Sequence, residues 1–336
     1  MTVAVLVNLH ARRGSEGIGE RIRSLLPLAR IAVTRSMADV RRWIADELLP
    51  QPPTLLLSGG GDGTAVALLN ELRTSGAPIP ALGVLPLGTG NGWAHETGAP
   101  SAMEAICRIA ALRGAPPPLR RFTLVETEGQ VAPFAGTGFD AELVSDFHAQ
   151  LEEKPAAIRE ASAGLGGYLS ALFSRTLPRA VWNGQSRVRV VNLGEDALTV
   201  DDEGRIVPIP GGTRGALLYD GPVGVAGAAS TPEWGFGFRA YPFAEAVPGR
   251  ISTRVYGAGP IEAASRMFQL WRGAHPLPKM HDFFVTRLRM DFDRDVPFQI
   301  GGDPIGQRRS IELAIADQHV DLVDWRKMGT RGAMVN

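Results

Sequence analysis

The stretch from Leu55 to Thr64, which reads LLLSGGGDGT, constrains the fold of this chain more than any other. Three consecutive leucines indicate a short buried strand of a parallel sheet. Glycines follow at once, and the residues after Thr64 (AVALLNELR) have the pattern of a helix. A strand that passes through glycines into a helix presents backbone N–H groups at the helix N-terminus, which commonly bind phosphate. Glycines allow positive φ angles and let a phosphate approach the main chain closely.

Asp62 follows these glycines, at a place where a plain phosphate site would not favour a carboxylate. We interpret it as the ligand of a divalent cation beside the phosphates, or of a water bound to that cation. An ordinary tight turn between a strand and a helix is the simpler alternative for a single loop of this kind.

A second loop of the same type begins at Val84, where the sequence reads VLPLGTGNGWA. It is again a predicted strand, a glycine loop and a predicted helix. In an open parallel sheet both loops lie at the carboxyl edge and face one ligand, so the pair indicates a nucleotide site more specifically than either loop alone. The predicted nucleotide ligands in the two loops are Gly60, Gly61, Asp62, Gly63, Thr64, Gly88, Thr89, Gly90 and Asn91.

The two loops resemble the catalytic domain of diacylglycerol kinases, which sphingosine and ceramide kinases and bacterial lipid kinases share. The resemblance rests on GGDGT and PLGTGN and continues through most of the chain. Its later landmarks, in the family's order, are GFDAELV from Gly138, PEWGFGFRAYPFA from Pro232, WRGAH from Trp271 and PFQIGGDPIG from Pro297. The resemblance implies a lipid kinase that uses ATP and Mg²⁺, with Asp62 at the metal and Thr34 bordering the nucleotide.

The same resemblance implies a general base in an Asp-Gly-Glu triplet near the end of the chain. The matching triplet here is Gly301-Gly302-Asp303, which makes Asp303 the predicted base and, with Asp62, a predicted catalytic residue. The carboxylate of an aspartate stands one methylene closer to the backbone than that of a glutamate, and a displacement of about 1 Å can cost ~10²-fold in rate. A turn residue before Pro304 is the alternative interpretation of Asp303.

Two more positions depart from the family pattern. Gly92 stands where the family has an aspartate after its second loop, and Pro248-Gly249 replaces an Asp-Gly turn near a structural Mg²⁺ site. These losses favour a catalytically degenerate protein that binds lipid or nucleotide as one alternative. A kinase with a soluble substrate, of the NAD-kinase type, is the other, because that family also uses GGDGT.

Composition limits the partners and the location of the protein. The 336 residues contain 35 Lys plus Arg and 35 Asp plus Glu, so the basic excess of a nucleic-acid binder is missing. Cys107 is the one cysteine, which excludes a disulfide within the chain and favours a cytoplasmic setting. We expect the apolar run at the N-terminus to be a strand rather than a signal peptide, and no stretch reaches the length of a transmembrane span, so a lipid substrate implies peripheral binding at the membrane surface. The oligomeric state stays open, a homodimer included.

The predicted fold has two domains with the active site in the cleft between them. Residues 1–118, ending at the helix-breaking GAPPP, form a nucleotide-binding α/β domain with a parallel sheet. Residues 119–302 form a mostly antiparallel β-rich domain for the lipid, with a helical insertion near 145–174. By resemblance, residues 303–336 return toward the first domain, and the tail after 326 is predicted to be disordered. Two late hairpins are expected, the first from residues 285–290 and 296–300, the second from residues 310–316 and 319–324.

Overall fold

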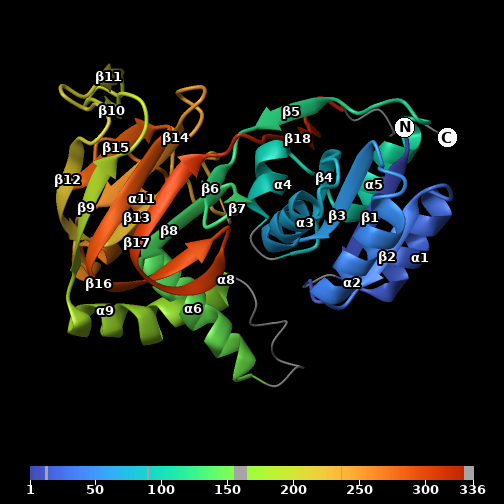
Figure 1. The fold of residues 1–336 in the computed structure, drawn as a ribbon. Helices are drawn as coiled ribbons and strands as arrows, with labels where there is room; N and C mark the ends of the chain where they lie inside the picture. Colours follow the sequence, from blue (N-terminus) through green and yellow to red (C-terminus); the bar gives the residue numbers. More distant parts are fainter. Residues whose placement is uncertain (12–13, 89–90, 155–164, 236, 329–336) are drawn as a thin grey trace. The chain divides into compact units, whose positions relative to one another are not determined.

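The chain folds into two compact units in this computed structural model, which describes residues 1–11, 14–88, 91–154, 165–235 and 237–328 (Figure 1). The first unit contains Met1–Phe122 and the stretch that begins at His319, and the second unit contains Thr123–Gln318. The chain therefore crosses between the units after Phe122 and after Gln318, where the sequence suggested crossings after residues 118 and 302.

The first unit is built on a six-stranded sheet with the order β2-β1-β3-β4-β18-β5. All neighbouring strands are parallel except β18 and β5, which are antiparallel. The leucines of β3 are completely buried, as the apolar run predicted, because helices cover both faces of a parallel sheet. The strands are β1 (Val3–Asn8), β2 (Arg30–Thr34), β3 (Leu55–Gly60), β4 (Ala81–Pro86), β5 (Leu119–Phe122) and β18 (Val320–Val323).

The helices of the first unit begin and end at residues suited to capping. The hydroxyl of Ser36 accepts a hydrogen bond from the N–H of Asp39 at 3.2 Å, which starts α2. Gly76 ends α3 in the left-handed region, with φ 71°. The elements are α1 (Glu16–Leu25), α2 (Met37–Trp43), the π-helix η1 (Ile44–Leu48), α3 (Asp62–Ser75), α4 (Gly92–Thr97) and α5 (Ala102–Ala111).

The second unit is built on a twelve-stranded sheet in which every pairing is antiparallel. The predicted fold class, a parallel α/β domain followed by an antiparallel β-rich domain, is confirmed. The strands are β6 (Val125–Thr127), β7 (Gln130–Ala132), β8 (Phe134–Gly138), β9 (Ser186–Asn192), β10 (Leu198–Val200), β11 (Ile206–Pro208), β12 (Leu217–Val223), β13 (Val225–Ala229), β14 (Ile251–Tyr256), β15 (Met280–Val285), β16 (Arg287–Ile300) and β17 (Asp303–Ile315).

A helical insertion interrupts this sheet between β8 and β9 and is longer than the predicted 145–174, part of which lies outside the described residues. It contains α6 (Phe139–Glu152), α8 (Leu165–Ala171), the π-helix η2 (Leu172–Thr176) and α9 (Leu177–Asn183). In Figure 1, α6 and α9 lie along the lower edge of the second unit. Two short helices follow later in the unit, α10 (Pro260–Ser265) and α11 (Met267–Trp271).

Both predicted late hairpins are wrong. The expected strands 285–290 and 296–300 belong mainly to one long strand, β16, whose register with β17 shifts between Asp291 and Val296. The turn lies instead at Gly301 and Gly302, whose φ angles of 60° and 94° suit the two-residue turn of a hairpin. β18 leaves the second unit altogether and pairs with β4 and β5 in the first. The predicted disordered tail falls largely on residues 329–336, which lie outside the described residues.

Candidate active site

The two glycine loops meet at the carboxyl edge of the parallel sheet. β3 and β4 run in register from Leu55 opposite Ala81 to Gly60 opposite Pro86, so the chain leaves both strands at the same level. The N–H groups of Leu87 and Gly88 then both donate hydrogen bonds to the carbonyl oxygen of Gly60, at 3.0 and 2.9 Å. The loops are therefore joined by the main chain itself.

The glycines of the first loop serve close packing and do not use the positive φ angles that glycine allows. Gly61 has φ −98°, and the other glycines of this loop also keep negative φ angles. A Cβ on Gly60 would lie 2.3 Å from the hydroxyl oxygen of Thr64. A Cβ on Gly88 would lie 2.2 Å from the Cα of Gly61. A side chain at Gly60 or Gly88 would thus push the first loop away from its own helix or from the second loop.

Asp62 holds the second loop in place. It is the first residue of α3, and its carboxylate accepts hydrogen bonds from the N–H groups of Gly92 at 2.6 Å and Trp93 at 3.1 Å. These are the first N–H groups of α4, so the carboxylate caps that helix from another element. Burial raises the pKa of Asp62 above its usual range, while the two N–H groups and the charge of His95 act in the opposite direction.

The surroundings of Asp62 also suit the predicted Mg²⁺. Mg²⁺ usually keeps several waters and takes one or two carboxylates together with substrate phosphates, so one aspartate beside a phosphate loop is sufficient. Each oxygen of the Asp62 carboxylate accepts one N–H in the structure and has a further lone pair. Within the described residues, no three His, Cys, Asp or Glu side chains group together as a metal site. Asp62 would therefore hold Mg²⁺ jointly with the phosphates rather than in a cage of protein ligands.

Two residues at the ends of neighbouring strands, Thr34 and Asn8, extend the site beyond the loops. Thr34 is the last residue of β2 and is buried, and its carbonyl oxygen accepts a hydrogen bond from the N–H of Leu9 at 3.0 Å. The side-chain amide of Asn8, the last residue of β1, donates to the hydroxyl of Thr64 at 3.0 Å. Asn8 was not predicted as a site residue, although a polar residue at the carboxyl end of a buried strand is the signal that identifies it.

The second loop is described only at its ends. Asn91 lies in the left-handed region with φ 53°, and its amide nitrogen donates to the carbonyl oxygen of Gly88 at 2.9 Å. The predicted ligands Thr89 and Gly90 lie outside the described residues. Gly92, where the family has an aspartate, is buried and gives its N–H to Asp62.

Asp303 lies in the second unit, directly after the Gly301-Gly302 turn and at the start of β17. The turn is held by the N–H of Gly302, which donates to the side-chain oxygen of Gln299 at 2.8 Å. Asp303 is exposed, yet the chain packed around its carboxylate raises its pKa above the usual range, and the charge of His148 on α6 opposes this shift. His148 is a second residue that the sequence did not single out.

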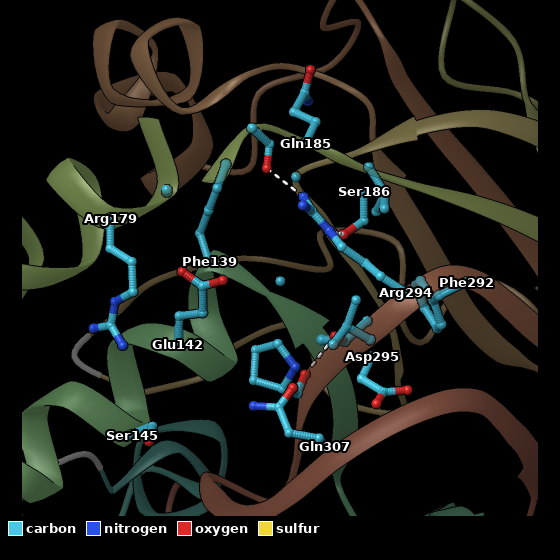
Figure 2. A pocket seen from close by; sticks show the side chains of 18 residues that line it. Phe139, Glu142, Ser145, Arg179, Gln185, Ser186, Phe292, Arg294, Asp295 and Gln307 are labelled. Carbon is cyan, nitrogen blue, oxygen red and sulfur yellow. Dashed lines mark hydrogen bonds between the residues drawn. The ribbon is translucent and has the colours of Figure 1, made fainter. Parts of the chain in front are cut away.

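A pocket of about 310 Å³ lies in the same unit, between α6, α9 and β16. Figure 2 shows Arg179 and Arg294 on opposite sides of it, with Glu142 between them. Arg294 is held in place because its guanidinium donates to the hydroxyl of Ser186 at 2.6 Å. Charged, amide and apolar side chains are mixed in the lining, and no sequence motif pointed to it. α6 and β17 connect the pocket with the neighbourhood of Asp303, since they carry His148 and Asp303 as well as lining residues.

Comparisons with known proteins agree with the geometry of the first unit. Residues 2–117 match the model of a protein family described as the diacylglycerol kinase catalytic domain. The resemblance to this family is confirmed. The first of the two units therefore contains the part of the chain that matches the diacylglycerol kinase catalytic domain.

Curated relatives carry lipid-kinase names but match only part of the chain. "Probable lipid kinase YegS" of Escherichia fergusonii is 34% identical over 109 residues, which cover 29% of this chain and 35% of the relative. "Probable lipid kinase YegS-like" of Citrobacter koseri is 35% identical over 85 residues, which cover 24% of this chain and 27% of the relative. The matched stretch thus spans about a third or less of these relatives.

Solved structures extend the similarity of fold to the whole chain. A diacylglycerol kinase from Bacillus anthracis superposes with a TM-score of 0.61 over 96% of both chains, at 14% identity. An NAD kinase from Archaeoglobus fulgidus in complex with ATP superposes with a TM-score of 0.51 over 98% of this chain and 95% of that one, at 12% identity. These neighbours show that both units have a known fold, and that this fold occurs in kinases with different acceptors.

Proposed function

We propose that this protein is an ATP-dependent lipid kinase, which transfers the γ-phosphate of ATP to a hydroxyl of a diacylglycerol-, ceramide- or sphingoid-like lipid. The observation that carries the proposal is the pair of glycine loops joined by Asp62, within a stretch that matches the diacylglycerol kinase catalytic domain. Phosphoryl transfer depends mainly on positioning and on charge stabilisation, and two joined loops at a sheet edge supply positioned N–H groups. A cytoplasmic protein that binds the membrane peripherally fits this proposal.

The chain's own residues have distinct tasks in the proposed reaction. The N–H groups of the loops bind the phosphates, with Thr34 and Thr64 beside them, while Asp62 holds the second loop and contributes to the metal site. Bound Mg²⁺ would neutralise charge on the phosphate oxygens. Asp303 takes the proton of the acceptor hydroxyl, whose oxygen bonds to the γ-phosphorus as the bond to the bridging oxygen of ADP breaks. The raised pKa of Asp303 makes it a stronger base than an ordinary aspartate.

The proposed acceptor site is the pocket between α6 and β16, together with Asp303. A volume of about 310 Å³ fits the polar part of a lipid rather than its chains. Small-molecule sites usually measure ~300–1,000 Å³ and combine apolar walls with a few polar groups, and this lining has that character. The proposed reaction requires the acceptor held in this site to reach the ATP bound at the nucleotide loops of the first unit.

An assay of acceptor specificity tests the function. The purified protein is incubated with radiolabelled ATP, Mg²⁺ and separate acceptors: diacylglycerol, ceramide, sphingosine and NAD, with product mass measured. We expect a phosphorylated lipid and no product from NAD. Phosphorylated NAD would instead support the second candidate, a kinase of the NAD-kinase type, which the superposition on an NAD kinase favours. Nucleotide binding without transfer to any acceptor would support a degenerate binding protein.

A further inference from the structure

The helices that follow α6 carry large apolar side chains on their outer face. α8, η2 and α9 join end to end into one helical run, because the residues at both junctions keep right-handed helical backbone angles. On its inner face Leu172, Thr176 and Ala180 recur at intervals of four residues and are buried. On its outer face Phe173 is 60% exposed and Trp182 is 90% exposed. A surface helix of a globular protein normally carries polar residues on its outer face, so these side chains need an explanation.

The exposed residues continue onto two neighbouring helices. α10 packs against α9, and α11 packs against α10. Ile261 on α10 is 70% exposed and Phe268 on α11 is 65% exposed. We call the set of exposed side chains on these helices the helical apolar surface; its members are Leu169, Phe173, Val181, Trp182, Ile261 and Phe268. Large exposed apolar patches mark interaction sites, and exposed apolar side chains gathered on packed helices point to such a site here.

The charges around this surface have a small positive excess. Residues 165–183 and 260–272 together contain four arginines and one acidic residue. Three of these arginines are paired with carboxylates: Arg175 with Glu153 and Arg179 with Asp146, which fastens the helical run to α6, and Arg266 with Glu262. The guanidinium of Arg272 lies over the ring of Phe268, 4.1 Å from its centre. Exposed aromatic side chains flanked by arginines are typical of helices that lie in the interface of a membrane containing anionic lipids.

We infer that the helical apolar surface is the face by which this protein docks on a lipid bilayer that contains anionic phospholipid. Trp182 and Phe173 insert at the level of the headgroups, and Arg272 beside Phe268 faces the phosphates. No described helix is long and apolar enough to cross a bilayer. The inference rests on the proposed function, because a lipid acceptor must be reached in a membrane.

Vesicle binding tests the surface directly. The full chain is sedimented with vesicles of phosphatidylcholine and phosphatidylglycerol, as wild type and as the double variant Phe173→Ser/Trp182→Ser. Because a tenfold change in affinity corresponds to about 1.4 kcal/mol, and inserting one large apolar side chain gains about that much, we expect a loss of roughly 100-fold. The matched control is Leu28→Ser in the first unit, which removes a leucine that is 97% exposed and should leave binding unchanged.

The fluorescence of Trp182 gives a second readout. Its indole moves from water into the interface on docking, so vesicles should shift the emission of the wild type to shorter wavelength. Trp182→Phe keeps an aromatic anchor and should retain most binding while most of this shift disappears. Trp43, Trp93 and Trp325 are buried in the first unit, whereas Trp234 and Trp271 are half-buried and Trp271 lies on α11, so the comparison is made in a Trp271→Phe background. Thermal unfolding of each variant shows whether the fold is intact.

Several outcomes would overturn the inference. They are unchanged vesicle binding in the double variant, an equal loss in Leu28→Ser, a blue shift that persists in Trp182→Phe, or a wild-type dimer that the double substitution dissociates. The last result would assign the surface to a second copy of the chain. The proposed function and the docking surface can fail separately. A protein that docks on vesicles but phosphorylates no lipid would support the docking surface and contradict the proposed function. A protein that phosphorylates a soluble short-chain acceptor without docking would support the proposed function and contradict the docking surface.

Discussion

Replacing Asp62 by alanine should damage both the stability of the first unit and the reaction. The substitution removes two hydrogen bonds to a carboxylate, from Gly92 at 2.6 Å and from Trp93 at 3.1 Å. Hydrogen bonds to charged groups contribute about 1.5–3 kcal/mol each, and Asp62 is only partly shielded from water, so we take the lower end, about 3 kcal/mol in total. For a unit of this size such a loss lowers the unfolding temperature by about 6–12 °C.

Asp62→Asn separates the structural task from the chemical one. An asparagine keeps one acceptor oxygen, so about half of the stability loss should remain, while its missing charge weakens the metal site. Thermal unfolding by circular dichroism, ATP affinity by calorimetry and turnover are measured for both variants. Asp46→Ala, at an exposed aspartate of η1 in the same unit, is the matched control and should change little. An unchanged unfolding temperature in Asp62→Ala would refute the proposed link between the loops.

Three further predictions concern the base and the loops. Asp303→Asn should lower kcat by about 10²–10⁴-fold with ATP affinity unchanged, and Asp303→Glu should keep part of the activity; near-normal turnover of Asp303→Asn would move the base elsewhere. Only the ionised carboxylate accepts a proton, so the acid limb of the pH–kcat profile should lie above the usual aspartate range. His148→Gln removes a charge that lowers the pKa of Asp303, so this limb should move to higher pH in that variant, and a shift to lower pH would contradict the prediction. Gly88→Ala should impair folding and ATP binding because its Cβ would lie 2.2 Å from Gly61, whereas Gly166→Ala, whose Cβ meets no atom within 4 Å, should not; equal effects would show that the contact is unimportant.

Local sequence pattern was sufficient for the strands and helices around the loops. Leu55–Leu57 and the helix after Thr64 follow from apolar periodicity, which acts over neighbouring residues and can be read without knowing the fold. The parallel sheet then requires both loops to lie at one edge. Ser36 and Asp39 also stand three residues apart, the local spacing of a capping pair, and Ser36 does start α2.

Pairing over long distances could not be predicted in the same way. Val320–Val323 reads as a hairpin partner of the strand before it, yet it lies between β4 and β5, because a short apolar strand fits any sheet edge that can bury it. The link from Asp62 to Gly92 joins residues 30 positions apart, and local spacing does not reveal such a bond. The sequence identified the glycines of the first loop as a phosphate-loop pattern. The structure shows that they are required because the first loop packs closely against Thr64 and against the second loop, and this packing of two separate segments is decided in three dimensions.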